Sequence, residues 1–169
     1  MAGNQGTTED QASVVTFDSS ARLQVQNYSL ASGATPALAY RGGGTNFQAG
    51  LSTAQGALRA GDPGLTPLLL FMSDGCSSTN GDATMRAIKA EFPTIHVHTI
   101  ACGSGADHRT LTNLAHAGGG TFHAAPDVTV LQQQFVHIAT NAGAVDGLIA
   151  EFAQQIADAV SNRLVLDYL

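Results

Sequence analysis

The chain of 169 residues is short of charge, since Lys, Arg, Asp and Glu together make up 12% of it. Globular domains usually carry about 25%. This scarcity excludes a coiled coil and a long solvent-exposed helix covered with ion pairs. Seven Lys and Arg stand against 13 Asp and Glu, so the net charge is −6. Because the few basic residues are scattered singly, we expect neither nucleic acid nor an anionic membrane as a partner.

Cysteine is equally scarce: Cys76 and Cys102 are the two in the sequence, which excludes a scaffold held by disulfides. We expect two free thiols, while a disulfide between them stays open because both lie near the carboxyl ends of predicted strands that should be neighbours. No run of about 20 apolar residues occurs, so neither a membrane-spanning helix nor membrane insertion is expected. Residues 1–10 contain no apolar stretch of the kind that a signal peptide needs. These absences do not indicate in which cellular compartment the protein lies.

Apolar residues, by contrast, make up 44% of the chain, and there are 19 glycines, which fall in clusters. The length suits one domain with a core of its own. Apolar periodicity and turn residues predict five strands, at 12–17, 22–26, 68–72, 95–102 and 121–124. Between and after the last four strands the pattern predicts four helices: one after Gly44, one capped by Asp82 or Thr84, one capped by Asp107, and one that starts at Pro126.

Strands that alternate with helices predict right-handed crossovers and a doubly wound, mostly parallel sheet with helices on both faces, of the Rossmann-like kind. The first two strands form a hairpin that adds an antiparallel pair at the edge. We expect a flexible lead at 1–10, the domain at 11–140, and a C-terminal amphipathic helix within 141–169. In such sheets the ligand site lies at the carboxyl ends of the strands.

Polar clusters at 42–46, 73–78 and 102–107 lie at the predicted carboxyl ends. Thr45 follows three glycines and precedes a helix, so its hydroxyl is either a helix cap or an oxygen ligand. Asp74 ends the most hydrophobic strand, where a carboxylate is costly unless it is paired, caps a turn or binds a cation. Hydroxyl and carboxylate oxygens suit Mg²⁺, Mn²⁺ or Ca²⁺ better than zinc.

The sequence lacks the common motifs of an enzyme active site. The glycine cluster lacks the lysine of a phosphate-binding loop, and neither a Gly-x-Ser-x-Gly turn nor a nucleophile–base pair occurs. A hydrolase or nucleotide-binding enzyme is therefore the weaker alternative, and we expect no catalytic residue. His96 and His98 share one strand face and could share a zinc ion, but their place in the first half of a strand favours solvated or packed histidines.

The blocks ASVVTFDSSA, GGGTNFQAGLSTA, LLLFMSDG and IHVHTIACGSGADHRTLTNLAHAGGGTFHAA stand in this order within 11–140 and resemble a von Willebrand factor type A domain. The resemblance implies a doubly wound sheet with one antiparallel edge strand, and a divalent cation at a metal-ion-dependent adhesion site. An acidic side chain of a protein ligand would complete the coordination of this cation. By position, Thr45 and Asp74 match the family's metal-site threonine and aspartate. The rim of the site would be Gly43, Gly44, Asn46, Ser73 and Gly75.

One part of the family pattern is missing. An Asp-x-Ser-x-Ser motif should end a central first strand, yet the match begins at the second strand, and Asp18-Ser19-Ser20 has the wrong spacing to replace it. Either the sequence starts after that strand, which we favour because Thr45 and Asp74 are present, or the chain is a divergent structural subunit with a vestigial metal site. In both cases the site is incomplete, and we expect weak or no binding of Mg²⁺ by these residues alone. Because a sheet without its central strand exposes apolar edges, we also expect the chain to aggregate or to recruit a replacement strand from another segment or subunit.

Overall fold

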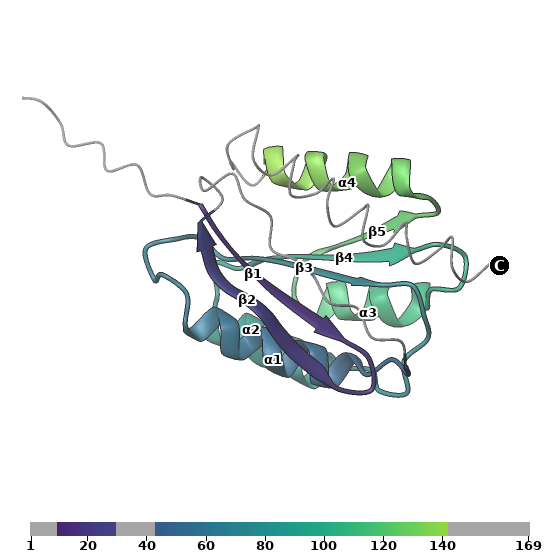
Figure 1. Ribbon diagram of the computed structural model, residues 1–169, viewed down its shortest axis with the longest axis horizontal. Coiled ribbons are helices and arrows are strands. Elements are labelled where there is room, and N and C mark those ends of the chain that lie inside the picture. Colours follow the sequence, from purple (N-terminus) through teal and green to yellow (C-terminus); the bar gives the residue numbers. More distant parts are fainter. Residues whose placement is uncertain (1–9, 30–42, 142–169) are drawn as a thin grey trace, which may run out of the picture.

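The structure, a computed structural model, describes residues 10–29 and 43–141 (Figure 1). Along the chain the elements are β1 (Gln11–Phe17), β2 (Ala21–Ser29), α1 (Phe47–Arg59), β3 (Leu68–Ser73), α2 (Asp82–Glu91), β4 (His96–Cys102), α3 (His108–Ala117), β5 (Thr121–Ala125) and α4 (Val128–Asn141). Residues 1–9 of the predicted lead at 1–10 lie outside the described residues, and so do residues 142–169 of the segment predicted to hold a C-terminal helix. The division of the chain at 11 and 140 stays a prediction.

A parallel sheet of three strands, in the order β3-β4-β5, forms the centre of the molecule. The apolar run of β3 places Leu69 and Phe71 on one face, where both are buried. Alternate residues of a strand point to opposite faces, so Leu68, Leu70 and Met72 face the other way and pack there against a second apolar cluster. Apolar residues on both faces are what a parallel sheet covered by helices requires.

Helices cover both faces of this sheet, as the alternating pattern predicts. In Figure 1, α1, α2 and α3 lie on one side of β3–β5 and α4 lies on the other. The larger core cluster joins the first three helices to the sheet, with Phe47, Leu51, Met85, Ile88, Leu111 and Leu114 fully buried. The smaller cluster joins α4 to the sheet through Leu131, Phe135 and Ile138. The doubly wound α/β class is therefore confirmed.

The hairpin β1–β2 is a separate antiparallel sheet rather than an extension of the parallel one. Among the described residues, no backbone ladder joins it to β3. Side chains make the connection instead: the ring of Phe17 stacks on Phe71 with centroids 5.1 Å apart, and meets Phe47 edge-on at 6.1 Å. The expected antiparallel pair is present, but side-chain packing attaches it to the domain.

The predicted N-terminal cap is present at α3 and absent at α2. Asp107 caps α3 as predicted, since its carboxylate accepts a hydrogen bond from the backbone N–H of Thr110. The prediction that Asp82 or Thr84 caps α2 is wrong, because Gly81 holds that position with φ +71° and no side chain caps the helix. Glycine adopts this left-handed backbone conformation without strain because it has no Cβ atom. A Cβ atom at Gly81 would also lie 2.7 Å from Leu51 Cδ1.

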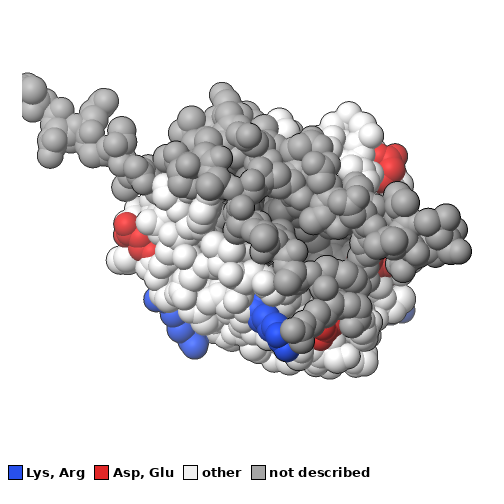
Figure 2. Space-filling model, in the orientation of Figure 1, with Lys and Arg blue, Asp and Glu red and all other residues white. Residues whose placement is uncertain are grey.

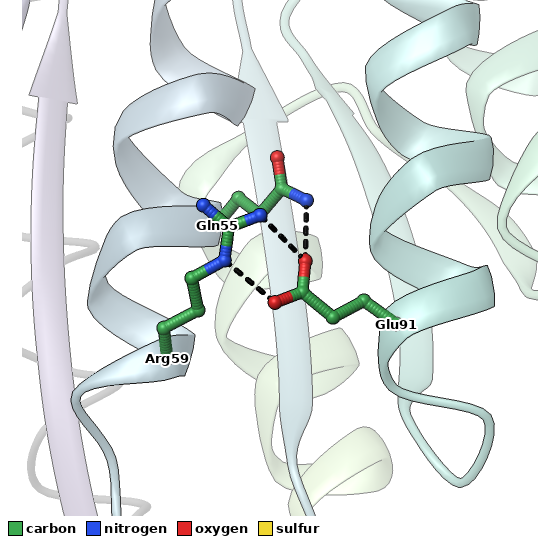
Figure 3. A network of polar contacts seen from close by, with 3 residues as sticks. All are labelled: Gln55, Arg59 and Glu91. Atoms are coloured by element: carbon green, nitrogen blue, oxygen red, sulfur yellow. Dashed lines mark hydrogen bonds and ion pairs between the residues drawn. The ribbon is translucent and has the colours of Figure 1, made fainter.

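A polar clamp ties the ends of α1 and α2 together on the surface (Figure 3). Arg59 donates two hydrogen bonds to the Glu91 carboxylate, at 2.6 and 2.8 Å, and Gln55 donates a third at 2.7 Å. Hydrogen bonding from Arg59 and then Gln55 lowers the pKa of Glu91, and the same contact raises the pKa of Arg59. Because the pair is exposed, it orients the helices more than it stabilises them.

The described surface carries few charged side chains (Figure 2), and the two cysteines are not bonded to each other. In the view of Figure 2, single charged side chains are separated by uncharged surface over the described residues. Cys76 is exposed, Cys102 is buried, and no disulfide joins them. Within the described residues, no helix is long and apolar enough to cross a membrane.

Candidate functional site

The loop before α1 and the loop after β3 meet at the carboxyl edge of the sheet. A Cβ atom placed on Gly75 would lie 3.0 Å from Thr45 Oγ1, so the Thr45 side chain is against the residue that follows Asp74. The Ser77 hydroxyl donates to the Thr45 carbonyl at 3.0 Å, and the Ser78 N–H donates to the same oxygen at 3.3 Å. The structure thus brings the two predicted cation ligands, Thr45 and Asp74, into adjoining segments.

The loop after β4 joins the same edge. A Cβ atom on Gly105 would lie 3.1 Å from the Asp74 carbonyl oxygen, and the Asp107 N–H approaches the Gly75 carbonyl at 3.5 Å. The Cys76 thiol contacts the Gly105 carbonyl at 3.8 Å. All three polar clusters of the sequence are therefore neighbours, as the rule for the carboxyl ends of parallel strands predicts.

Asn46, not Thr45, caps α1. Its side-chain oxygen accepts from the Ala49 N–H at 3.0 Å. The interpretation of Thr45 as the helix cap is therefore wrong. The reason is one of position, because the cap must be the residue directly before the first helical one, and that residue is Asn46. The structure assigns Thr45 Oγ1 no part in capping the helix.

Two hydroxyls that the sequence did not single out also serve the start of α1. Ser77 Oγ accepts from the Phe47 N–H at 3.1 Å, and Thr79 Oγ1 accepts from the Gln48 N–H at 3.2 Å. These bonds occupy backbone donors that would otherwise attract an anion. The arrangement disfavours a phosphate at this helix end. In the sequence, the run of three hydroxyl residues at 77–79 was the available signal.

The turn of the β1–β2 hairpin supports the glycine rim from the other side. The Asp18 carbonyl accepts from the Asn46 N–H at 2.8 Å, and Ser19 Oγ accepts from the Gly44 N–H at 3.1 Å. The Asp18 carboxylate bonds the Ser20 N–H at 2.7 Å. The turn does not replace an Asp-x-Ser-x-Ser strand end, but it holds the rim residues Gly43 and Gly44 in place, a role that sequence spacing alone did not reveal.

The donors at this edge are hard oxygen atoms. Asp74 and Thr45 are half-buried, while Ser73 is buried at 8% exposure and its Oγ lies 3.3 Å from the Gly75 nitrogen. A carboxylate and hydroxyls fit Mg²⁺, Mn²⁺ or Ca²⁺. Within the described ranges, no three His, Cys, Asp or Glu side chains form a group that could hold a metal ion. This edge thus offers few ligands of its own, and a hard cation here would take most of its coordination from water.

The loops at this edge also hold the carboxylate of Asp107, which accepts two hydrogen bonds. Thr110 donates to Asp107 from its hydroxyl at 2.7 Å and from its backbone N–H at 3.0 Å. These hydrogen bonds lower the pKa of Asp107. Negative charge thus borders the loops, which raises the local concentration of cations.

The solved structures of several proteins resemble this fold at low identity. BatB from Bacteroides thetaiotaomicron has a TM-score of 0.57 at 13% identity, with 86% of this chain and 80% of that chain covered. An aerotolerance-related membrane protein from Bacteroides fragilis gives 0.54 at 14%, with 93% and 80% covered. Proximal thread matrix protein 1 from the mussel byssus, solved with a zinc-occupied MIDAS motif, gives 0.51 at 17%, covering 87% of this chain and 35% of the mussel protein. The chain therefore spans about a third of that protein's length, and these likenesses show the fold.

Among curated protein sequences no match is found. A family model does match, and its description is von Willebrand factor type A domain. It covers residues 7–124, which include the hairpin, the glycine rim, the Ser-Asp-Gly strand end and all five strands except the last residue of β5. The chain belongs to the von Willebrand factor type A domain family.

Proposed function

We propose that this domain is a protein-interaction module whose ligand site is the carboxyl edge of the sheet. The observation that carries the proposal is the contact between Thr45 and Gly75, which places a hydroxyl and the Asp74 segment side by side among three converging loops. Membership of the family supports an interaction module as the general class. A divalent cation is also supported by the mussel protein of similar fold, which was solved with a zinc-occupied MIDAS motif.

Thr45 and Asp74 would hold the cation, and Gly43, Gly44, Asn46, Ser73 and Gly75 would form the rim. When bound, a divalent cation supplies a Lewis-acidic position that an acidic side chain of a partner can fill. The chain's own residues supply a hydroxyl and a carboxylate, and hydrogen bonds to Asp18 and Ser19 fix the backbone of the rim residues Asn46 and Gly44. Because the chain contributes few ligands, binding of Mg²⁺ without a partner should be weak.

The test is selection of peptides from a random library on the immobilised chain in Mg²⁺. The selected peptides should share an Asp or Glu, and EDTA should release them. Thr45→Ala should lose them, whereas Ser78→Ala, an exposed hydroxyl in the adjacent loop, should keep them. Peptides that lack an acidic residue, or that stay bound in EDTA, would refute the cation mechanism. A selection that yields no peptide in Mg²⁺ or Mn²⁺ would favour the alternative, a structural subunit with a vestigial site.

A further inference from the structure

Four of the six histidines of the chain gather on the α4 side of the sheet, away from the candidate cation site. His96 and His98 lie at the amino end of β4, His123 is on β5, and His137 is in the second half of α4. In Figure 1, α4 runs back over the sheet, so that its C-terminal half covers the amino ends of β4 and β5. The site at the carboxyl edge, with its oxygen donors, is at the other end of these strands.

Two of these imidazoles touch. His98 Nδ1 lies 3.0 Å from His123 Nε2, and the ring centroids are 5.2 Å apart. Both residues belong to neighbouring strands whose backbone ladder pairs His98 with Thr121 and Ile100 with His123. The backbone ladder between the two strands fixes the spacing of these residues. Two nitrogen donors are thus preorganised at one point of the surface.

The distance suits a transition-metal ion. Metal–nitrogen bonds to imidazole are about 2.0–2.1 Å long. Two nitrogens 3.0 Å apart then subtend an angle of about 95° at the ion, close to the 90° of octahedral or tetragonal coordination and further from the tetrahedral angle. Tetragonal sites with nitrogen and oxygen ligands are typical of Cu²⁺ and Ni²⁺. Burial lowers the pKa of both rings, which keeps them in the neutral form that binds metals.

A residue of α4 orients one of the two rings. Gln134 hydrogen-bonds the His123 side chain, and this bond raises the pKa of His123 against the effect of burial. While Gln134 bonds this side chain, Nε2 of the ring faces His98. Such second partners hold ligating histidines in most metal sites.

We propose that His98 Nδ1 and His123 Nε2 together bind one Cu²⁺ or Ni²⁺ ion, with water in the remaining positions. The two nitrogens share a hydrogen bond in the absence of metal, so the ring that donates it releases that proton and takes up one from water at its other nitrogen. The site is distinct from the proposed Mg²⁺ site in both place and donor chemistry. Its affinity is limited by its two protein ligands, because no third His, Cys, Asp or Glu among the described residues converges on the same point. Cu²⁺ binds more tightly than Ni²⁺, as the general order of first-row metals requires.

The test is calorimetric titration of the full chain with Ni²⁺ in a large excess of Mg²⁺, which occupies oxygen sites. We expect one ion per chain, with affinity reduced at least tenfold by His98→Gln and by His123→Gln. His116→Gln, an exposed histidine of α3, should leave the affinity unchanged, and so should Asp74→Asn. Gln134→Ala should weaken binding by a smaller factor, about tenfold or less, because it acts through the orientation of His123.

Electron paramagnetic resonance of the wild-type chain with one equivalent of Cu²⁺ provides a measurement independent of any variant. It should show hyperfine coupling to two imidazole nitrogens. The proposal is overturned if the double variant His98→Gln/His123→Gln keeps wild-type affinity, if His116→Gln loses as much as the pair, or if Asp74→Asn abolishes binding. It is equally overturned if the Cu²⁺ spectrum shows one nitrogen or none, which requires no folded variant.

Discussion

The attachment of the hairpin depends on Phe17, whose ring contacts Phe71 and Phe47 while no described backbone ladder reaches β3. Removing a fully buried Phe ring costs about 3–5 kcal/mol. Phe17 is half-buried, so Phe17→Ala should cost roughly half of that. The lost aromatic geometry adds about 0.5 kcal/mol, the lower end of the usual range. We therefore expect a loss of about 2–3 kcal/mol in the free energy of unfolding.

Urea denaturation followed by circular dichroism measures this loss directly. For a chain of this length, about 2–3 kcal/mol corresponds to a fall in Tm of roughly 5–10 °C. Leu23→Ala is the matched control, since Leu23 lies in the same hairpin with 39% of its surface exposed, and it should change stability by less than about 0.5 kcal/mol. If Phe17→Ala is no more destabilising than Leu23→Ala, the hairpin is held by something other than the Phe17 contacts.

Three other predictions follow from the described contacts. Gly81→Ala should destabilise the chain by about 1–3 kcal/mol in the same assay, because φ is +71° and the new methyl would meet buried Leu51; an unchanged midpoint would contradict that geometry. Arg59→Ala should cause a small loss that disappears at high salt, and a loss independent of salt would mean that packing matters more than charge. Burial lowers the pKa of His98 and His123 below the ordinary value of 6.5. Between the lowered pKa values of the folded state and pH 6.5, the unfolded state therefore binds more protons than the folded state. Stability should therefore be constant above about pH 6.5, fall as the pH drops toward the folded pKa values, and level off below them; a flat profile from pH 7 to 5 would contradict the lowered pKa values.

The pH effect has several physical sources around His98. Burial disfavours its charged form first, and positive charge on His123, His96 and His137 opposes protonation further. Around His123, burial and His137 act in the same direction, whereas Gln134 opposes them. Replacing both His98 and His123 with Gln should therefore flatten the acid limb of the stability profile.

Much of the fold was predictable because its signals are local. The apolar run of β3 and the helical spacing of Leu111, Leu114 and Ala115 define buried faces without knowledge of their partners, and the structure buries them. Asp107 was predictable as a cap, because an aspartate directly before an amphipathic run has one common use. These predictions needed only the neighbours of each residue in the sequence.

The remaining features depend on contacts between distant segments. Asn46 rather than Thr45 caps α1, and Ser77, 31 residues after it, completes the capping. The start of α2 depends on the close packing of Gly81 against Leu51. The residues around Gly81 in the sequence do not predict this contact. The meeting of His98 with His123 depends on strand register, which the sequence does not specify. The interpretation of the histidines as merely solvated or packed therefore missed their contact.

The central claim is that the carboxyl edge of the sheet holds a divalent cation through Thr45 and Asp74. Its most direct test is the NMR spectrum of the isotopically labelled chain titrated with Mn²⁺, whose paramagnetism broadens nearby resonances even when binding is weak. The account predicts that the amides of Gly44, Thr45 and Gly75 broaden first, and that Asp74→Asn removes this effect. Broadening that begins at Glu91, or that spares the strand-end loops altogether, would contradict it.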